Sequence, residues 1–247
     1  MSDRVKALVL CAGKGKRLET EGVDLPKVMR LANGKPLLHY VLSALDFLPV
    51  KDVILVVGYR KDHVLSTYPD YPHALQAQQL GTGHAVKCAQ EVLKGFDGHI
   101  LVCYGDMPLM KRSTYQALVA THLKEGNLCT LLSGRADQPL PYGRIIRDSQ
   151  GRFLRIVEHK DATEAERAVT ELNAGIYLFQ AQPLWEALTH LKSDNVQSEY
   201  YLTDVPGYLL TQGGQVGVCD ACTPQEMLGV NTIEQLSQVE TILRKEV

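Results

Sequence analysis

The sequence predicts an α/β fold with a mostly parallel sheet that has helices on both of its faces. The first observation is that short, continuously apolar runs alternate with longer stretches of helical period. The second is that several apolar runs end directly in glycine-rich or polar loops. Right-handed crossovers bring the ends of parallel strands to one edge of the sheet. We therefore expect ligands to bind along that edge.

The alternation occupies about residues 1–133. Its helical patterns begin at Lys35-Pro36, at Gly83 and at Ser113, which is a plausible N-cap for a helix that reaches Lys124. The predicted strands are Val5 to Leu10, Val53 to Val57, Ala74 to Ala77, Ile100 to Cys103 and Leu128 to Leu132.

From about residue 134 the rhythm changes, and the pattern predicts a β-hairpin laid beside the main sheet. Its strands, at Ile145-Ile146 and Phe153 to Val157, flank a turn at Asp148 to Gly151. The other predicted elements are a strand Val169 to Phe179, a helix Pro183 to Leu191, a helix Tyr200 to Leu210, a strand Val216 to Cys219 and an amphipathic helix Thr232 to Lys245. Because no linker or repeat separates these parts, we expect residues 1–247 to form a single domain.

Composition excludes some classes of protein. The net charge of −2 provides no basic field for binding nucleic acid. No apolar run approaches the roughly 20 residues that span a bilayer, and the first residues lack a signal-peptide pattern, so we expect no membrane insertion and a cytoplasmic location. Cys219 and Cys222 form a C-x-x-C pair, which would suit a redox pair or half a zinc site. Without a second pair or suitably spaced histidines, we interpret it as incidental.

A glycine-rich loop follows the first strand and is a candidate phosphate site. It comprises Leu10, Cys11, Ala12 and Gly13 at the end of the strand, with the cations Lys14, Lys16, Arg17 and Lys27 around the loop. Glycine lets backbone N–H groups approach an anion, and lysine and arginine neutralise it, so a polyphosphate is the expected guest. The spacing matches neither G-x-G-x-x-G nor G-x-x-x-x-G-K-[ST]. A glycine turn with solvated lysines is the alternative.

A metal site is predicted at the same edge. Asp106 follows the fourth strand directly, after Tyr104 and Gly105. Mg²⁺ takes few protein ligands beside bound phosphates, and a carboxylate at a strand end is a usual one. Asn231 is a candidate second oxygen ligand. The alternatives are a turn cap for Asp106 and a helix N-cap for Asn231.

The loop from Gln76 to Gly83 is polar and glycine-rich between a predicted strand and helix. Glutamine offers a donor and an acceptor, which suits the edge of uracil or a similar base, and Gly81 and Thr82 lie beside it. A helix N-cap by Thr82 is the structural alternative and is compatible with base binding. With no second histidine at metal spacing, we interpret His84 as a helix residue.

Two polar residues at strand ends of the second part, Glu158 and Asn173, suit recognition of sugar hydroxyls and a sugar phosphate. Taken singly, each is more often a turn or surface residue.

Together these residues resemble the sugar-phosphate nucleotidyltransferases. More narrowly, the chain is similar to the N-terminal uridylyltransferase domain of the bacterial bifunctional N-acetylglucosamine-1-phosphate uridylyltransferase/glucosamine-1-phosphate acetyltransferases. The matching strings run in family order across nearly all 247 residues: Leu10-Cys-Ala-Gly-Lys-Gly-Lys-Arg17, Leu25-Pro-Lys27, Gln76-Ala-Gln-Gln-Leu-Gly-Thr-Gly-His-Ala85, Tyr104-Gly-Asp-Met-Pro-Leu109, Tyr142-Gly-Arg-Ile145, Ile156-Val-Glu-His-Lys-Asp-Ala-Thr163, Leu172-Asn-Ala-Gly-Ile-Tyr177, Ser198-Glu-Tyr-Tyr-Leu-Thr-Asp204 and Gly229-Val-Asn231.

The resemblance implies a Rossmann-like fold of the nucleotide-diphospho-sugar transferase type, with residues 1–133 binding the nucleotide, 134–231 binding the sugar phosphate, and 232–247 as a C-terminal helix. It implies Mg²⁺-dependent synthesis of UDP-N-acetylglucosamine from UTP and N-acetylglucosamine 1-phosphate. For the nucleotide, the resemblance implies that Leu10 to Gly13 cover it, that Arg17 and Lys27 contact its phosphates, and that Gln76, Gly81 and Thr82 bind the uracil. Tyr104 and Gly105 would line the site, and Asp106 and Asn231 would bind Mg²⁺. Gly143, Glu158 and Asn173 would contact the sugar phosphate, with Tyr201 and Thr203 nearby.

Three positions depart from the family pattern. Lys16 replaces a small hydroxyl residue, which adds charge over the triphosphate. Ala174 stands where threonine is usual and Ser198 where glycine is usual, and both border the expected sugar pocket. The family's acetyltransferase domain of hexapeptide repeats has no counterpart, so we do not expect acetylation of glucosamine 1-phosphate. The family's trimerisation resides largely in that domain, which leaves the oligomeric state open.

Two alternative functions remain open at this stage. One is a related nucleotidyltransferase with another sugar phosphate or another nucleotide. The other is a non-catalytic nucleotide-sensing protein on the same fold, for which a complete metal and triphosphate site would be unnecessary.

Overall fold

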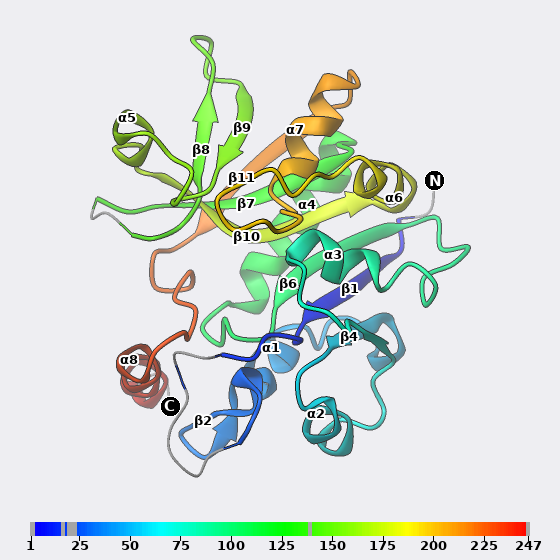
Figure 1. Cartoon of the computed structure of the whole chain (residues 1–247), viewed down its shortest axis with the longest axis vertical. Coiled ribbons are helices and arrows are strands. Elements are labelled where there is room, and N and C mark those ends of the chain that lie inside the picture. Colours follow the sequence, from blue (N-terminus) through cyan, green and yellow to red (C-terminus); the bar gives the residue numbers. More distant parts are fainter. Residues whose placement is uncertain (1–2, 16–17, 19–23, 138–139, 246–247) are drawn as a thin grey trace.

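The computed structural model describes residues 3–15, 18, 24–137 and 140–245 and is built around one main sheet (Figure 1). The strand order is β11-β7-β10-β6-β1-β4-β5, and the hairpin β8–β9 joins it through β10. The strands are β1 Val5–Leu10, β4 Val53–Val57, β5 His73–Leu75, β6 His99–Tyr104, β7 Cys129–Arg135, β8 Arg144–Arg147, β9 Phe153–Val157, β10 Glu171–Gln180 and β11 Val216–Cys222, with a small separate pair, β2 Leu31–Ala32 and β3 Lys35–Pro36.

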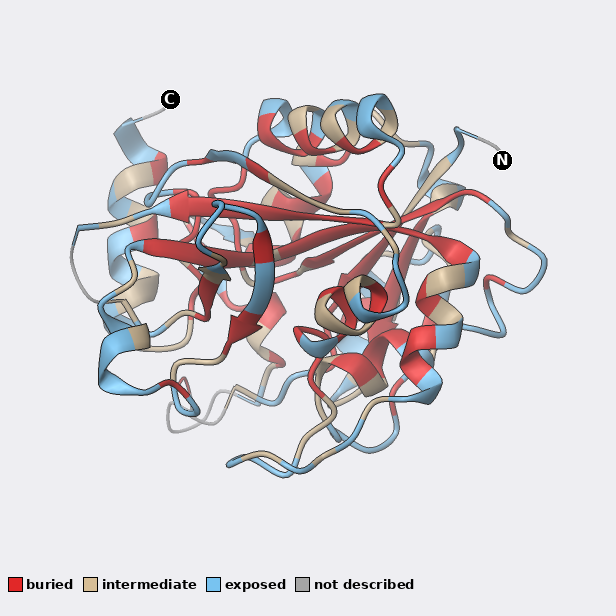
Figure 2. Ribbon diagram, turned by 90° about the horizontal axis from the view of Figure 1, so that it is seen from above, coloured by how far each residue is buried: buried red, intermediate tan, exposed pale blue. Residues whose placement is uncertain are grey.

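Helices cover both faces of the sheet, as the sequence predicts (Figure 2). In β1, Ala7 and Val9 pack toward α1 and α4, whereas Leu8 and Leu10 pack toward α3, α6 and α7. This alternation follows from the two-residue period of a strand. The helices are α1 Leu37–Ala44, α2 Lys61–Thr67, α3 Thr82–Lys87, α4 Arg112–Glu125, α5 Glu164–Arg167, α6 Ala181–Thr189, α7 Asp204–Thr211 and α8 Ile233–Lys245, with short 3₁₀ turns at Lys27–Met29 and Val50–Asp52.

The predicted parallel arrangement is confirmed for β1, which pairs in parallel with β4 and β6, and for β4–β5 and β7–β11. The order of the strands was not predicted. β10 lies between β6 and β7 and is antiparallel to both, so strands from the two parts of the chain are interleaved in one sheet. The hairpin was placed correctly, but it continues the sheet through the pair Leu172 and Arg144 instead of lying beside it.

Several predicted boundaries were wrong. Ser113 does not cap α4, because the helix begins at Arg112 with Lys111 at its N-cap. The buried carboxylate of Glu226 takes the capping role, accepting hydrogen bonds from the Lys111 N–H (3.2 Å) and the Thr114 hydroxyl. A cap supplied from 115 residues away leaves no local signature in the sequence.

The helix expected from Tyr200 instead begins at Asp204. Tyr200 stays extended because its N–H donates to Leu80 O (2.9 Å) and its carbonyl accepts from Gly83 N (2.8 Å). The strand expected at Ala74 to Ala77 ends at Leu75, so Gln76 belongs to the following loop. The helix expected from Gly83 begins one residue earlier, at Thr82, after Gly81.

Cys219 and Cys222 are buried free thiols of β11. Burial raises the pKa of the Cys222 thiol, which keeps it protonated and unreactive. Across the described residues no group of three or more His, Cys, Asp or Glu side chains converges to hold a metal, and no helix is long and apolar enough to cross a membrane.

A buried pair of histidines links β6 to α4. His99 Nδ1 lies 3.0 Å from His122 Nε2, and His122 Nδ1 lies 2.9 Å from the hydroxyl of Thr130 on β7. Burial lowers the pKa of both imidazoles below the ordinary value of 6.5, because a charged ring loses its hydration there. Both rings are therefore neutral in the folded protein near neutral pH.

Acidification should destabilise the protein through this pair. Below pH 6.5 the unfolded chain binds protons that folded His122 does not, so the free energy of unfolding falls, by at most about 1.4 kcal/mol per pH unit for one such group. Urea unfolding between pH 7.5 and 5 should show a shallower pH slope in His122→Gln than in the wild type. His63→Gln, at an exposed position of α2, is the control. Parallel slopes for wild type and His122→Gln would contradict this account.

Candidate functional site

A pocket of about 230 Å³ opens at the carboxyl ends of β1, β5 and β6. Parallel strands place the loops that follow them at one edge of the sheet. Most of the residues that are predicted to bind the nucleotide come together at this edge. Those that line the pocket are Leu10, Ala12, Gly13, Lys27, Gln76, Gly81, Thr82, Tyr104 and Asp106, together with Val28, Gln79, Ala85 and Glu199, which the sequence did not single out.

Two of the residues that are predicted to bind the nucleotide, Cys11 and Gly105, lie behind the pocket wall. The Cys11 side chain is buried in the core, and burial raises the pKa of its thiol. A Cβ on Gly105 would lie 2.9 Å from Cys11 Sγ and 2.9 Å from a methyl group of Val28, so only glycine fits at this position. The Gly105 N–H donates to Leu10 O (3.0 Å), which joins the ends of β6 and β1. The side chain of Cys11 and residue Gly105 thus shape the site from behind.

The predicted metal ligands and the predicted phosphate-binding lysine meet in one cluster. The Lys27 ammonium forms an ion pair with Asp106 Oδ2 and donates to Asn231 Oδ1 at 2.7 Å, although Asn231 is 204 residues away. The side chains of Lys27 and Asp106 are 15% and 16% exposed, so the cluster is largely shielded from water. Two oxygens from different parts of the chain therefore converge on one cation.

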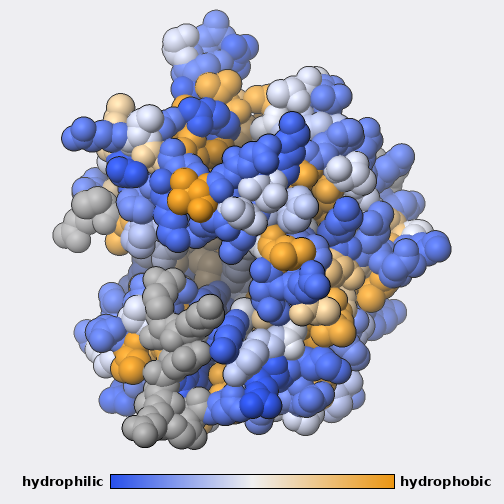
Figure 3. All heavy atoms as spheres, viewed as in Figure 1, coloured by the Kyte–Doolittle hydropathy of each residue, from blue (hydrophilic) through white to orange (hydrophobic). Residues whose placement is uncertain are grey.

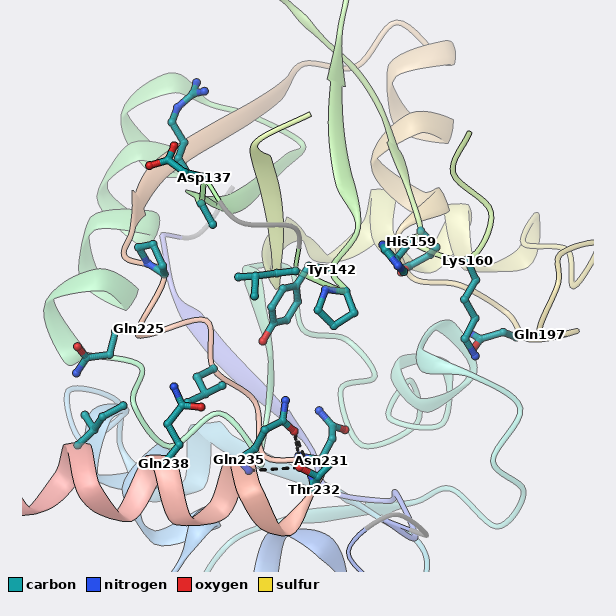
Figure 4. A pocket seen from close by; sticks show the side chains of 18 residues that line it. Asp137, Tyr142, His159, Lys160, Gln197, Gln225, Asn231, Thr232, Gln235 and Gln238 are labelled. Carbon is teal, nitrogen blue, oxygen red and sulfur yellow. Dashed lines mark hydrogen bonds between the residues drawn. The ribbon is translucent and has the colours of Figure 1, made fainter. Parts of the chain in front are cut away.

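The N-cap alternative for Asn231 was wrong, because Thr232 caps α8. The Thr232 hydroxyl accepts from Gln235 N (3.3 Å), and Gln235 Oε1 accepts from the backbone N–H groups of Thr232 (3.1 Å) and Asn231 (2.7 Å). This is a capping box, in which side chains satisfy the first donors of a helix. It leaves the Asn231 side chain to accept from Lys27. Figure 4 shows Asn231 beside Thr232 and Gln235, with the hydrogen bonds of this cap as dashed lines.

The glycine loop is fitted closely over Lys27. Gly15 has φ +70°, and a Cβ there would lie 2.8 Å from Lys27 Cβ. Lys14 Nζ lies 5.3 Å from the centre of the Tyr59 ring, outside the pocket lining. Lys16 and Arg17 fall outside the described residues, so the role of Arg17 on the phosphates stays a prediction.

The wall where the base is predicted to bind is built from Gln76 and Gly81. Gln76 is buried, and its Nε2 donates to Gly81 O at 3.1 Å. Gly81 has φ +107° and ψ 175°, a region open almost only to glycine. A Cβ there would also lie 2.6 Å from Tyr200 O, so the backbone of the 198–204 segment closes directly over this turn.

Gly81→Ala should therefore disrupt the pocket in two ways, through backbone strain at positive φ and through a clash of the added methyl group with the backbone at Tyr200. Gly213→Ala is a matched control, because Gly213 also has positive φ (+78°) but open space around its Cβ position. We expect Gly213→Ala to cost about 1 kcal/mol in urea unfolding, and Gly81→Ala to cost more and to weaken binding of the predicted nucleotide, measured by calorimetry with UTP, by about tenfold or more. Equal effects of the two substitutions on UTP binding would contradict the proposed geometry.

Three of the predicted sugar residues lie in a row across neighbouring strands. Arg144 pairs with Val157 on β9 and with Leu172 on β10. Gly143, one residue before Arg144, therefore lies between Glu158 and Asn173. Its carbonyl accepts from Asn173 N (2.9 Å). The Asn173 side chain is held by the Tyr177 hydroxyl (2.6 Å) and the Gly175 N–H (3.1 Å).

Glu158 is the charged member of this row. The Thr203 hydroxyl donates to Glu158 Oε1 at 3.1 Å, and the Tyr201 hydroxyl lies 3.4 Å from Asp161. Burial raises the pKa of Glu158, and the Thr203 hydrogen bond partly offsets that rise. Glu158, Tyr201 and Thr203 line a hollow of about 390 Å³. Ser198, one of the departures, has φ +53° in the loop before Tyr200.

A larger groove, of about 1150 Å³, runs between the hairpin part of the fold and α8 (Figure 4). Both Glu158 and Asn231 line it. Figure 3 shows the corresponding face as hollowed between an upper and a lower part, with a mostly hydrophilic rim. Because Asn231 also contacts Lys27, the Lys27 cluster lies where this groove meets the smaller nucleotide-side pocket.

Sequence reasoning missed Glu199 and Gln79 as lining residues. Gln79 lies within the quoted loop, and its Nε2 donates to Gln76 O at 3.3 Å, so its position in that loop was a usable signal. Glu199 reaches the pocket only because the backbone around Tyr200 pairs with Leu80 and Gly83, a contact over more than 100 residues. No local pattern announces it.

Comparison with known proteins places this geometry in a family. Residues 7–192 match the family described as the MobA-like NTP transferase domain. Proteins named "Bifunctional protein GlmU" from Brevibacillus brevis, Clostridium acetobutylicum and Clostridium botulinum are 41%, 41% and 42% identical over 99%, 98% and 96% of this chain. Each alignment covers 52% of the relative, so the chain spans about half the length of the curated relatives it matches. The fold is that of nucleotide-diphospho-sugar transferases, and the chain belongs to the MobA-like NTP transferase family.

Proposed function

We propose that this nucleotidyltransferase joins UTP to N-acetylglucosamine 1-phosphate, forming UDP-N-acetylglucosamine and pyrophosphate with Mg²⁺ as cofactor. The observation that carries the proposal is that the cluster of Lys27, Asp106 and Asn231 lies between the nucleotide-side pocket and the larger groove. The pocket is lined by the residues predicted to bind the nucleotide, and the groove is lined by Glu158 of the predicted sugar row. This cluster, with its Lys27 ammonium, stands where the phosphates of two substrates would meet.

The residues of the cluster suit Mg²⁺. A carboxylate oxygen of Asp106 and an amide oxygen of Asn231 already converge on one cation, the Lys27 ammonium. Hard oxygen ligands of this kind suit Mg²⁺, which completes its shell with substrate phosphates and water. When bound, Mg²⁺ would neutralise charge on the triphosphate. With Asp106 and Asn231 engaged in this way, the Lys27 ammonium would be released toward the phosphates, as the sequence predicts.

The base side of the pocket favours uracil. Among the described residues, no hydrogen bond uses the Gly81 N–H or Gln76 Oε1. A donor beside an acceptor complements O4 and N3–H of uracil, whereas cytosine presents a donor and an acceptor in the opposite order. The wall thus matches UTP better than CTP.

The proposed reaction needs no protein nucleophile. An oxygen of the sugar phosphate attacks the α-phosphorus of UTP in line, the bond from that phosphorus to the β-phosphate oxygen breaks, and pyrophosphate leaves with the electron pair. The attacking phosphate is already ionised at neutral pH, so no general base is required. The described residues contribute in two ways: the nucleotide-side pocket and the larger groove position the two substrates, and Lys27 neutralises phosphate charge.

Pyrophosphate release over a matrix of the four common NTPs and several sugar 1-phosphates, with Mg²⁺, tests the proposal. We expect UTP with N-acetylglucosamine 1-phosphate to give the highest kcat/KM. Preference for glucose 1-phosphate would indicate that Ala174 and Ser198 have changed the sugar. No turnover with any pair would favour a nucleotide-sensing protein instead.

A further inference from the structure

The imidazole of His84 lies behind the predicted base wall and is not used by the proposed reaction. His84 is on α3, half-buried, and its Nδ1 lies 3.2 Å from Gln76 Nε2. It does not line the pocket, whereas Gln76 does. His84 therefore contacts the base-binding residue from the side away from the ligand.

The hydrogen bonds fix which way the Gln76 amide points. Gly81 O can only accept, so the Gln76 atom 3.1 Å from it must be the amide nitrogen. That nitrogen has a second proton, which is directed to His84 Nδ1. With both protons engaged, Gln76 Oε1 is the part of the amide that remains for the pocket. Gly81 O and His84 Nδ1 together thus present an acceptor to the base.

The same geometry fixes the tautomer of His84. Because Nδ1 accepts from Gln76, the ring proton must be on Nε2. The sulfur of Cys88, one helical turn later, lies 3.8 Å from Nε2 and 3.9 Å from Nδ1, so it packs against the ring without distinguishing the two nitrogens. Burial raises the pKa of the Cys88 thiol and keeps it neutral. Two hydrogen bonds of the Gln76 amide nitrogen, to Gly81 O and to His84 Nδ1, thus leave Gln76 Oε1 for the pocket.

We propose that His84 is a positioning residue for base selectivity, which acts together with Gly81 O to hold the Gln76 amide with its oxygen toward the base, so that UTP is preferred over CTP. This inference rests on the proposed function in one respect, which is that the base binds at Gln76 and Gly81. If the amide turned round, it would offer N–H groups to the N3–H of uracil, and a site whose buried polar groups are mismatched discriminates against the ligand. His84 lines neither the nucleotide-side pocket nor the larger groove, so its effect should be confined to nucleotide selection through Gln76.

Two substitutions of similar size separate this role from packing. His84→Asn keeps an acceptor oxygen near the position of Nδ1, and His84→Leu removes it. His39→Leu, at a half-buried histidine of α1 outside the pocket, is the control. Each variant is assayed for UTP and CTP turnover and for equilibrium binding of both nucleotides, after urea unfolding confirms that it folds.

We expect His84→Leu to lower the ratio of kcat/KM for UTP over CTP about tenfold, mainly through KM for UTP, with kcat within about threefold of the wild type. His84→Asn and His39→Leu should keep the ratio within about threefold. An unchanged ratio in His84→Leu, or equal losses in the Leu and Asn variants, would overturn the inference. If the wild type has no turnover, the proposed function fails, but the UTP-to-CTP ratio of dissociation constants still decides the role of His84. A wild type that binds both nucleotides equally would overturn that role.

Discussion

Asp106→Ala is expected to reduce nucleotidyl transfer by about a thousandfold or more while the protein stays folded. Among the described residues, this side chain supplies the one carboxylate that pairs with Lys27, so its removal takes away both the proposed Mg²⁺ ligand and the charged partner of Lys27. The structural contact of this residue is made by its backbone, whose carbonyl accepts from Val230 N at 2.9 Å, and alanine keeps it. Activity assays with a Mg²⁺ titration and urea unfolding measure the two effects separately.

Asp97→Ala is the matched control, because Asp97 pairs with Arg4 at the surface (3.1 Å) and lies at the opposite end of β6 from Asp106. It should leave activity within about twofold of the wild type, since exposed ion pairs contribute little. If Asp106→Ala retained Mg²⁺-dependent activity, the metal assignment would be wrong. If it unfolded, the carboxylate would be structural instead.

Lys27→Met should have opposite effects on activity and on metal binding. In the structure the Lys27 ammonium occupies the two oxygens that a metal would use, so a metal has to displace it. Without this competitor, the nucleotide-free protein should bind Mn²⁺, a paramagnetic substitute for Mg²⁺, roughly tenfold more tightly, or by about 1.4 kcal/mol. Turnover should still fall at least a hundredfold, because the same cation is proposed to neutralise the triphosphate.

Lys27→Arg and Lys61→Met are the controls for this prediction. Arginine keeps the charge, so Mn²⁺ binding should stay close to that of the wild type. Lys61 begins α2 and lies outside the pocket lining, so its replacement should change neither quantity. Electron paramagnetic resonance of free Mn²⁺ gives the affinity. Weaker Mn²⁺ binding in Lys27→Met would show that Lys27 does not compete for this site.

The sequence predicted best what depends on local periodicity. β4 is a continuous apolar run, and β1 and β6 are largely apolar, because both faces of these strands are mostly buried. The ends of β1 and β6 carry Gly13 and Asp106 to one edge. Once the strands are parallel, this placement follows from the fold. The convergence of Gln76, Gly81 and Thr82 on the same pocket follows in the same way.

What could not be predicted depends on contacts between distant residues. Nothing local shows that β10 enters between β6 and β7, that Glu226 caps α4, or that Glu199 reaches the nucleotide-side pocket. Lys27 was predicted to meet phosphates, whereas the structure holds it on Asp106 and Asn231. Each of these features depends on contacts between residues that are many tens of positions apart. No short stretch of a single sequence shows such contacts.

We propose that the Lys27 cluster brings a uridine nucleotide and a sugar phosphate together for transfer. Mass spectrometry of the products formed from UTP and N-acetylglucosamine 1-phosphate, with Mg²⁺ and with EDTA, tests this proposal. We expect UDP-N-acetylglucosamine and pyrophosphate in equal amounts, and neither product once EDTA removes the metal. UMP or UDP without a nucleotide sugar, or equal product formation in EDTA, would contradict it.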